Sequence, residues 1–347
     1  MQTRVARLYG EKDIRVETQR TPDPGEGEVL LRMAVGGICG SDLHYYQDGG
    51  FGPVRVREPM IVGHEASGYV EALGAGVAGL RVGQLVAVNP SQPCGACRFC
   101  KVGQTIHCPN MHFMGSAMRL PHVHGMFRDR LVVSGGKCVA VGSEITAAEA
   151  ACTEPLAVCL HAVSRAGVLT GKKILVTGSG PIGALVVAAA RLAGAAEIVV
   201  CDLMDAALER ARAMGATTLV NIARDHEKLS QYGQDKGYFD IAFECSAAPS
   251  AIRNVIEVVR PLGTIVQVGI AGDVVVPLNA LVAKELNWVG SQRFDCEFTR
   301  AAHLIANRAI DVRPIISHTF NIDEAVMAFN QAGDRTKACK VQLTFFS

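Results

Sequence analysis

The sequence predicts an α/β protein in two parts, a mainly β first half followed by a doubly wound parallel sheet. The chain has 347 residues, more than a single hydrophobic core usually serves, so two domains are expected. At about Ala147 short β-branched runs between glycine-rich turns give way to strands that alternate with helical stretches. A glycine-rich turn between a strand and a helix, early in the second half, supports the same division.

The first half contains short β-branched and apolar runs that are typical of strands. These runs are Val29–Ala34, Ala66–Ala72, Gln84–Asn89 and Arg130–Val133. Glycine-rich turns separate them, as expected for a mainly β domain.

The second half repeats a strand and a helix. The predicted strands are Lys173–Thr177, Glu197–Asp202, Thr218–Asn221, Phe239–Cys245 and Thr264–Gly269. Stretches of helical period lie between most of them, which implies a parallel sheet with helices on both faces. A charged helical segment near Thr299–Ala306 and the apolar ending Lys340–Phe346 are expected to pack back on the first part.

The composition favours a small molecule as the partner. Hydrophobic residues make up 49%, charged residues 19%, and the net charge is +1, which gives no electrostatic reason to expect nucleic acid or a membrane surface. Met1–Gly10 lacks an apolar core of signal-peptide length, and charged residues and glycine interrupt the most apolar stretch, Ala184–Val200. We therefore expect a cytoplasmic protein.

A dinucleotide-binding turn follows the first strand of the second half. The turn consists of Gly178, Ser179, Gly180, Pro181, Ile182 and Gly183. Gly178 permits the tight turn, Gly180 lets the backbone approach a pyrophosphate, and Gly183 allows close packing of helix and strand. This context predicts a Rossmann sheet. The alternative is a glycine turn in a doubly wound fold that binds no dinucleotide.

Asp202 closes the next predicted strand. A carboxylate at this distance from the glycine turn meets the ribose hydroxyls of the adenosine. Its charge would repel a 2′-phosphate, and Arg210 and Arg212 lie within the following helical stretch rather than at the strand end. NAD is therefore favoured over NADP.

Four cysteines form a second motif. They are Cys94, Cys97, Cys100 and Cys108. In a chain without a secretion signal, four thiols in one loop suit a closed tetrahedral zinc site that stabilises the fold. An iron–sulfur cluster and a zinc ribbon that contacts nucleic acid are the alternatives, the latter disfavoured because the loop carries only Arg98 and Lys101 as cations.

Three further segments carry side chains that could perform chemistry. They contain Cys39, Ser41 and His44 in one glycine-rich turn, the pair His64 and Glu65, and Glu154 before a proline. Each has an ordinary alternative when taken alone, such as a buried thiol, a core histidine or a carboxylate at a helix start.

Taken together, these motifs resemble the zinc-containing medium-chain alcohol dehydrogenases over almost the whole chain. The resemblance implies a GroES-like catalytic domain over residues 1–148, completed by 289–347, and a Rossmann domain over 149–288. It also implies two zinc ions, one catalytic and one structural, and a cofactor of the NAD(P) type. Glu154 occupies the position at which the classical alcohol-dehydrogenase branch of the family has a second cysteine. The chain therefore resembles the polyol dehydrogenase branch more closely.

The resemblance implies a role for each candidate. Cys39 and His64 match ligands of the catalytic zinc. Glu65 and Glu154 match family glutamates, one of which binds the metal directly and the other through water, and the sequence leaves open which is which. Ser41 matches the hydroxyl that takes the substrate proton, and His44 the imidazole that passes it outward.

The loops are similar to those of the L-idonate 5-dehydrogenases, which implies a sugar acid as substrate. The loops that carry this similarity are residues 42–47, 89–95, 114–118, 121–125 and 290–294. Tyr45, Arg119 and Arg293 are the predicted substrate residues, and His122 and His124 are further possible cations for a substrate carboxylate. The alternatives are a sorbitol, xylitol or L-threonine dehydrogenase, or an inactive zinc-stabilised nucleotide-binding protein. By analogy with the family, we expect a homo-oligomer, either a dimer or a tetramer.

Overall fold

The computed structural model describes residues 1–270 and 272–346. The chain folds into two compact units. The first comprises Met1–Glu154, Phe298–Arg308 and Ile316–Ser347, and the second comprises Pro155–Glu297 and Ala309–Ile315. Each unit is described by itself.

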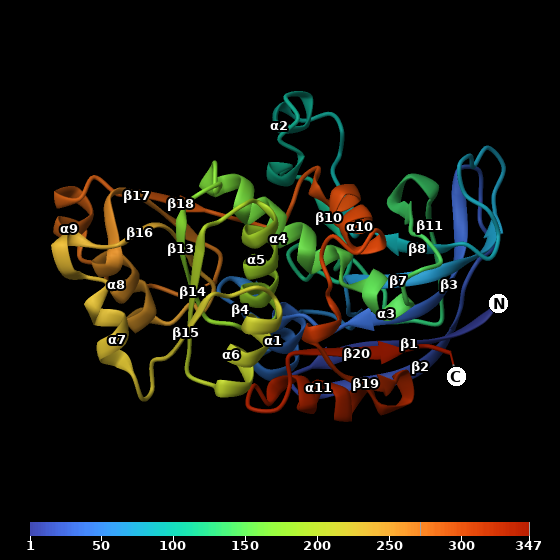
Figure 1. Ribbon diagram of the computed structural model, residues 1–347. Coiled ribbons are helices and arrows are strands. Elements are labelled where there is room, and N and C mark those ends of the chain that lie inside the picture. Colours follow the sequence, from blue (N-terminus) through green and yellow to red (C-terminus); the bar gives the residue numbers. More distant parts are fainter. Residues whose placement is uncertain (271, 347) are drawn as a thin grey trace. The chain divides into compact units, whose positions relative to one another are not determined.

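A seven-stranded sheet forms the centre of the first unit (Figure 1). Its order is β12-β8-β7-β3-β20-β19, and β11 also pairs with β3. The strands are β3 Glu28–Gly37, β7 Glu65–Leu73, β8 Leu85–Val88, β11 Arg130–Ser134, β12 Cys138–Ala140, β19 Ile316–Asn321 and β20 Lys340–Thr344. The four strands predicted in the first half are confirmed. The expected return of the C-terminal segment is confirmed too, because β20 pairs antiparallel with β3.

A second, three-stranded sheet was not foreseen in the sequence. It consists of β1 Gln2–Gly10, β2 Asp13–Arg20 and β6 Met60–Ile61. The remaining short strands of this unit are β4 Gly50–Phe51, β5 Val54–Arg55, β9 Ser91–Gln92 and β10 His112–Phe113. The helices are α1 Gly40–Asp48, α2 Arg98–Lys101, α3 Ala147–Ala151, α10 Glu297–Ala306 and α11 Ala325–Gly333.

The core of the first unit is packed around Phe127, whose ring lies 6.3 Å from that of Phe329 and 6.1 Å from that of Phe345. The same ring lies against two glycines. A Cβ atom on Gly36 would lie 2.7 Å from Phe127, and one on Gly63 would lie 2.1 Å away. These glycines come just before the segments that carry Cys39 and His64. Core packing therefore sets where both segments begin.

The second unit is built on a six-stranded parallel sheet of order β15-β14-β13-β16-β17-β18 (Figure 1). The strands are β13 Lys173–Thr177, β14 Glu197–Asp202, β15 Thr218–Asn221, β16 Phe239–Glu244, β17 Val259–Gln267 and β18 Asn287–Gly290. Numbered along the chain, this order is 3-2-1-4-5-6, with the switch point between β13 and β16. The predicted Rossmann fold is confirmed.

Helices connect these parallel strands. They are α5 Pro181–Leu192, α6 Asp205–Ala213, α7 His226–Gln231, α8 Pro249–Val258 and α9 Leu278–Ala283, and α4 Thr153–Ala166 precedes the first strand. α5 packs on β13 and β14, and α8 packs on β16 and β17. The strands between them are almost continuously buried, as expected for a sheet covered on both faces. Among the described residues, no helix combines the length and the apolar character that crossing a membrane requires.

Candidate metal and cofactor sites

The four cysteines of the predicted structural site lie together. The sulfur atoms of Cys94, Cys97, Cys100 and Cys108 are all within 4.8 Å of one another. The short pairing of β9 with β10 closes the loop that carries them, and Cys97 caps α2 by accepting from the Cys100 amide at 3.5 Å. The amides of Ala96 and Cys97 lower the pKa of the Cys94 thiol to about 6. This all-thiol set, with amides that favour a thiolate, fits a tetrahedral zinc ion.

A second group of candidate ligands lies where β3 ends and β7 begins, within the seven-stranded sheet of the first unit. The ligand atoms of Cys39, His64 and Glu65 are within 4.8 Å of one another. Cys39 lies between β3 and α1, His64 precedes β7, and Glu65 is the first residue of β7. Gly37 pairs with Glu65 in register, and a Cβ there would lie 2.3 Å from Glu65 Oε2. The missing side chain at Gly37 makes room for the carboxylate.

Asp42 joins the two segments that carry Cys39 and His64. Its buried carboxylate accepts hydrogen bonds from the Cys39 amide at 3.0 Å and the Gly63 amide at 3.2 Å. The Cys39-to-Asp42 spacing is that of a helix capping box, a signal present in the sequence that our motif search did not use. Asp42 therefore holds two candidate ligands in place without being one of them.

Lys340 is the other residue missing from the sequence prediction. Its Nζ lies 2.7 Å from Glu65 Oε1, also donates to the Ile38 carbonyl at 3.1 Å, and is fully buried with Glu65. Burial lowers the pKa of Lys340, but the charges of Glu65 and Cys39 outweigh it, so the pKa is raised. No local motif marks this pair, because β20 brings Lys340 to β3 from the far end of the chain.

Within the described part of the chain, two buried polar atoms of the group have no hydrogen-bond partner. They are His64 Nδ1 and Glu65 Oε2. Burial and the Glu65 charge raise the pKa of the Cys39 thiol to about 11, so a cation would be needed to hold the thiolate near neutral pH. A sulfur, an imidazole and a carboxylate with unsatisfied atoms fit a zinc ion.

Glu154 lies outside this three-residue group, in the first turn of α4. Its carboxyl is buried, and burial raises its pKa to about 8; the charges of Glu65 and Cys39 raise it and that of His64 lowers it. These interactions place Glu154 near the group.

The glycine turn has the geometry that its sequence predicts. Gly178 has φ of +80°, and a Cβ on Gly183 would lie 1.8 Å from the Gly178 carbonyl oxygen. Gly180 is the N-cap of α5, and a Cβ there would meet no atom within 4 Å. Pro181 and Ile182 form the first turn of α5. The amides at this helix end can therefore be approached by a phosphate.

Asp202 ends β14 beside this turn. Its Oδ2 accepts from the Ser179 amide at 2.6 Å and its Oδ1 from the Met204 amide at 2.9 Å. The carboxylate is thus held at the carboxyl end of the sheet, where dinucleotides bind in this fold class.

The comparisons with known proteins identify the family of the chain. The alcohol dehydrogenase GroES-like domain family matches residues 25–143, and the zinc-binding dehydrogenase family matches residues 181–307. The chain is 41% identical over 339 residues to the L-idonate 5-dehydrogenase (NAD(P)(+)) of Escherichia coli, with 97% of each chain covered.

The chain belongs to the zinc-containing medium-chain alcohol dehydrogenase family. It is 34% identical to the human sorbitol dehydrogenase, covering 93% of this chain and 90% of the relative. It also matches the crystal structure of the Escherichia coli L-idonate 5-dehydrogenase with a TM-score of 0.94, 40% identity and 99% of each chain covered. The protein is an NAD(P)-linked oxidoreductase, which confirms the predicted enzyme class.

The two residues of the predicted proton relay lie on α1 of the dehydrogenase. Ser41 is partly buried in the first turn. His44 is exposed, and its Nδ1 lies 3.1 Å from Asp48 Oδ2. Its ring lies 5.9 Å from that of Phe51, so the imidazole is in reach of solvent.

The predicted substrate residues are spread over both units of the dehydrogenase. Tyr45 is buried and its hydroxyl accepts from the Ala117 amide at 3.2 Å, which ties α1 to the loop that carries Arg119. Arg119 is half-buried in the first unit. Arg293 is half-buried in the second, with φ of +50°.

The structure argues against His122 and His124 as cations for a carboxylate. His122 Nε2 accepts from the Arg57 amide at 2.9 Å, and its Nδ1 lies 2.6 Å from the Arg119 carbonyl oxygen, which requires the hydrogen on Nδ1. His124 Nδ1 accepts from the Ile61 amide at 3.3 Å. Both rings hold the backbone around residues 57–61 instead.

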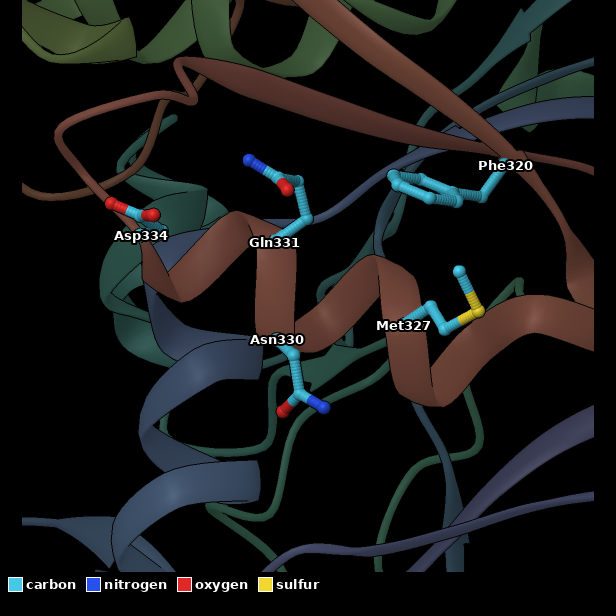
Figure 2. Close-up of a pocket in the computed structure, with 5 residues that line it drawn as sticks. All are labelled: Phe320, Met327, Asn330, Gln331 and Asp334. Atoms are coloured by element: carbon cyan, nitrogen blue, oxygen red, sulfur yellow. The ribbon is translucent and has the colours of Figure 1, made fainter.

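A hollow on α11 contains none of the predicted site residues. Figure 2 shows the side chains that line it: Phe320, Met327, Asn330, Gln331 and Asp334. Asp334 is the single ionisable side chain among these lining residues.

Proposed function

We propose that this dehydrogenase oxidises the secondary hydroxyl of L-idonate to give 5-ketogluconate, with NAD as the hydride acceptor. The observation that carries the proposal is the 41% identity to an L-idonate 5-dehydrogenase over 97% of both chains. A sorbitol or related polyol is the second candidate, because sorbitol dehydrogenases also match nearly the whole chain. We also propose a cytoplasmic location, with no nucleic acid or membrane as partner.

In this proposal Cys39 and His64 bind the catalytic zinc, with Glu65 or Glu154 completing the set. Glu65 Oε1 is held by Lys340 and its Oε2 is free of hydrogen bonds, which supports Glu65 as a ligand through that oxygen. A bound zinc ion would act as a Lewis acid and lower the pKa of the substrate hydroxyl. Ser41 would accept the hydroxyl proton and His44 would pass it to solvent.

We assign the second zinc ion to Cys94, Cys97, Cys100 and Cys108, as a structural site. Four thiols leave no open position for a substrate or water, so this ion would stabilise its loop and take no part in the reaction.

The cofactor preference is assigned to Asp202. In the proposed complex, Gly178, Gly180 and Gly183 with Pro181 and Ile182 hold the pyrophosphate at the start of α5, and Asp202 accepts hydrogen bonds from the adenosine ribose. Asp202→Ser should weaken NAD and improve the relative use of NADP, because a carboxylate that repels the 2′-phosphate is removed. Steady-state kcat/KM for both cofactors measures this, and an unchanged ratio would mean that another residue selects the cofactor.

A screen of substrates tests the proposed reaction. The enzyme should act on L-idonate with kcat/KM about tenfold to a hundredfold above that for sorbitol, because a desolvated charge pair with the carboxylate contributes about 1.5–3 kcal/mol. The screen includes xylitol and L-threonine, each with NAD and NADP. A preference for sorbitol or xylitol would replace the substrate and leave the zinc chemistry in place. No turnover on any of them by zinc-loaded protein would favour the non-enzymatic alternative.

Arg293 and Arg119 are the two candidates for binding the substrate carboxylate, and Tyr45 is a further candidate substrate residue. Arg293→Met should lower kcat/KM for the acid more than for the neutral polyol, and Arg119→Met serves as the parallel variant. Equal losses on acid and polyol would show that the arginine orients hydroxyls rather than binding the carboxylate.

A homo-oligomer, a dimer or tetramer, is the last part of the proposal. β18 is an edge strand that pairs on one side only with β17, and unpaired edge strands readily pair with a second chain. Val275, Leu278 and Val282 are 85%, 67% and 75% exposed close by in sequence, and such apolar exposure is typical of an interface. Light scattering on purified protein measures the state directly, and a monomer at micromolar concentration would contradict it.

A further inference from the structure

Glu244 is a buried carboxylate at the carboxyl end of the Rossmann sheet. It is the last residue of β16 and has 0% exposed surface. An isolated buried carboxylate is costly, so its partners must be strong. Glu244 is not part of the glycine motif and makes no contact with Asp202 among those described.

Through its two carboxylate oxygens, Glu244 accepts hydrogen bonds from the ends of β13 and β17 and from the loop after β16. Oε1 accepts from the Ser246 amide at 2.9 Å, from the Ser246 hydroxyl, and from Thr177 Oγ1 at 3.3 Å. Oε2 accepts from Gln267 Nε2 at 2.6 Å, and the Ala247 amide lies within 3.1 Å of both oxygens. The carboxylate is thus fully satisfied by its own neighbours.

These partners form one row across the switch point of the sheet. Thr177 ends β13 and pairs in register with Glu244, which in turn pairs with Gln267 of β17. β13 belongs to the half of the fold that carries the glycine turn, and β16 and β17 belong to the other half. In this fold class each half binds one nucleotide of the dinucleotide. Glu244 therefore connects the two halves where the cofactor crosses them.

The loops held by Glu244 lie against the glycine turn and against each other. A Cβ on Gly178 would lie 2.9 Å from the Cα of Ser246, and one on Gly269 would lie 2.6 Å from the Ala247 nitrogen. Ala247 has φ of +61°, a left-handed conformation that is unfavourable for a residue other than glycine. The two bonds from its amide to Glu244 hold it in that conformation.

We propose that Glu244 is a positioning residue for the nicotinamide cofactor, which fixes the loops after β16 and β17 relative to the glycine turn without touching the dinucleotide. This inference rests on the cofactor part of the proposed function. Loss of the carboxylate should leave the adenosine half of the site intact and misplace the other half. It should therefore weaken binding of the whole dinucleotide and spare binding of its AMP portion.

Isothermal titration calorimetry of zinc-loaded Glu244→Gln with NADH and with AMP tests this. The amide would place an N–H donor among donors and release the loops from their bound position. If the free energy of one lost hydrogen bond to a charged group must be recovered when the loops are ordered by the cofactor, NADH binding should weaken by about tenfold to a hundredfold. The AMP dissociation constant should change by less than about twofold. Glu257→Gln, an exposed acid on α8 of the same unit, is the matched control and should alter neither constant.

Thr177→Val is the second variant, in case Glu244→Gln does not fold. It removes only the hydroxyl that links β13 to Glu244, and should weaken NADH by about twofold to tenfold with AMP unchanged. Unchanged NADH affinity in the folded variants overturns the inference. Equal losses of NADH and AMP overturn it too, since they would indicate general damage to the sheet. A wild-type protein that fails to bind NADH would instead contradict the proposed function.

Discussion

At the scale of single residues, the pair of Lys340 and Glu65 is expected to matter for stability because both side chains are charged and buried. Both side chains are buried, at 3% and 1% exposed, and the described contacts of Glu65 provide no other cation. Removing one member of a buried pair leaves an uncompensated charge, which costs far more than the pair itself contributes.

We predict that Lys340→Met lowers the free energy of unfolding of metal-free protein by about 3–5 kcal/mol. Urea unfolding after removal of metal by a chelator measures it. Lys337→Met is the control, because Lys337 is 73% exposed and lies 3.5 Å from Asp334, an exposed pair of the kind that contributes about 0–1 kcal/mol. Equal effects of the two substitutions would mean that Glu65 does not depend on Lys340 for its charge.

His44 leads to a prediction about pH. Its exposed imidazole beside Asp48 suits a group that exchanges protons with water. His44→Ala should reduce kcat most at low pH, where solvent bases are too weak or too scarce to take the proton directly, and the deficit should shrink as the pH rises. A pH profile of kcat parallel to that of the wild type would exclude His44 from the relay.

The sequence predicted the residues that motifs can reveal and missed those that depend on distant segments. The Cys39 turn and the His64–Glu65 pair are short patterns, and the ligand atoms of all three residues do lie together. Lys340 is 275 residues from Glu65 along the chain, so no local pattern connects them. Glu244 was missed for a related reason, because its partners lie on β13, on β17 and in the loop after β16.

At the scale of secondary-structure elements, the cysteine loop should act on stability alone. α2 has four residues, none of them buried, so little packing holds this loop. Cys100→Ser should therefore lower the melting temperature and release one zinc ion. Differential scanning calorimetry with metal analysis measures both.

Cys39→Ser is the reciprocal variant and should abolish turnover while the fold persists. Circular dichroism and activity measured on the same sample separate these effects. The reverse pattern, with Cys100→Ser inactive but stable and Cys39→Ser unfolded, would show that the two sites have been assigned the wrong way round.

The strands show where local patterns predict well. β13, β14 and β15 have the bounds expected from the sequence, because buried parallel strands read as continuous apolar runs. β1 and β2 escaped prediction because charged side chains interrupt them. Arg7 and Glu17 form an ion pair at 3.1 Å between the two strands. Such a pair stabilises strand pairing, but it does not produce the apolar run from which a strand is predicted. β17 begins at Val259, five residues before its predicted start, and continues through Pro261 and Gly263.

At the scale of the whole molecule, the two candidate metal sites predict how many zinc ions each chain binds. Protein purified without chelator should contain about two zinc ions per chain, because a closed thiol site and a site with mixed ligands are separate in the structure. Inductively coupled plasma mass spectrometry measures the content. One ion in wild type would remove one of the two assignments, and the Cys39→Ser and Cys100→Ser proteins would show which.

The path of the chain through the two units has a consequence for biosynthesis. The first unit is interrupted twice, and its central strand β3 has β20 as a neighbour. A ribosome adds about 5–20 residues per second. Lys340 follows Glu65 by 275 residues, so the carboxylate is made on the order of 15–55 s before its counter-charge. During that interval β3 has no β20 to pair with, and Glu65 has no counter-charge from Lys340. A zinc ion captured in that interval would bind before β20 docks, whereas an ion captured after synthesis would bind beside a sheet that already contains β20.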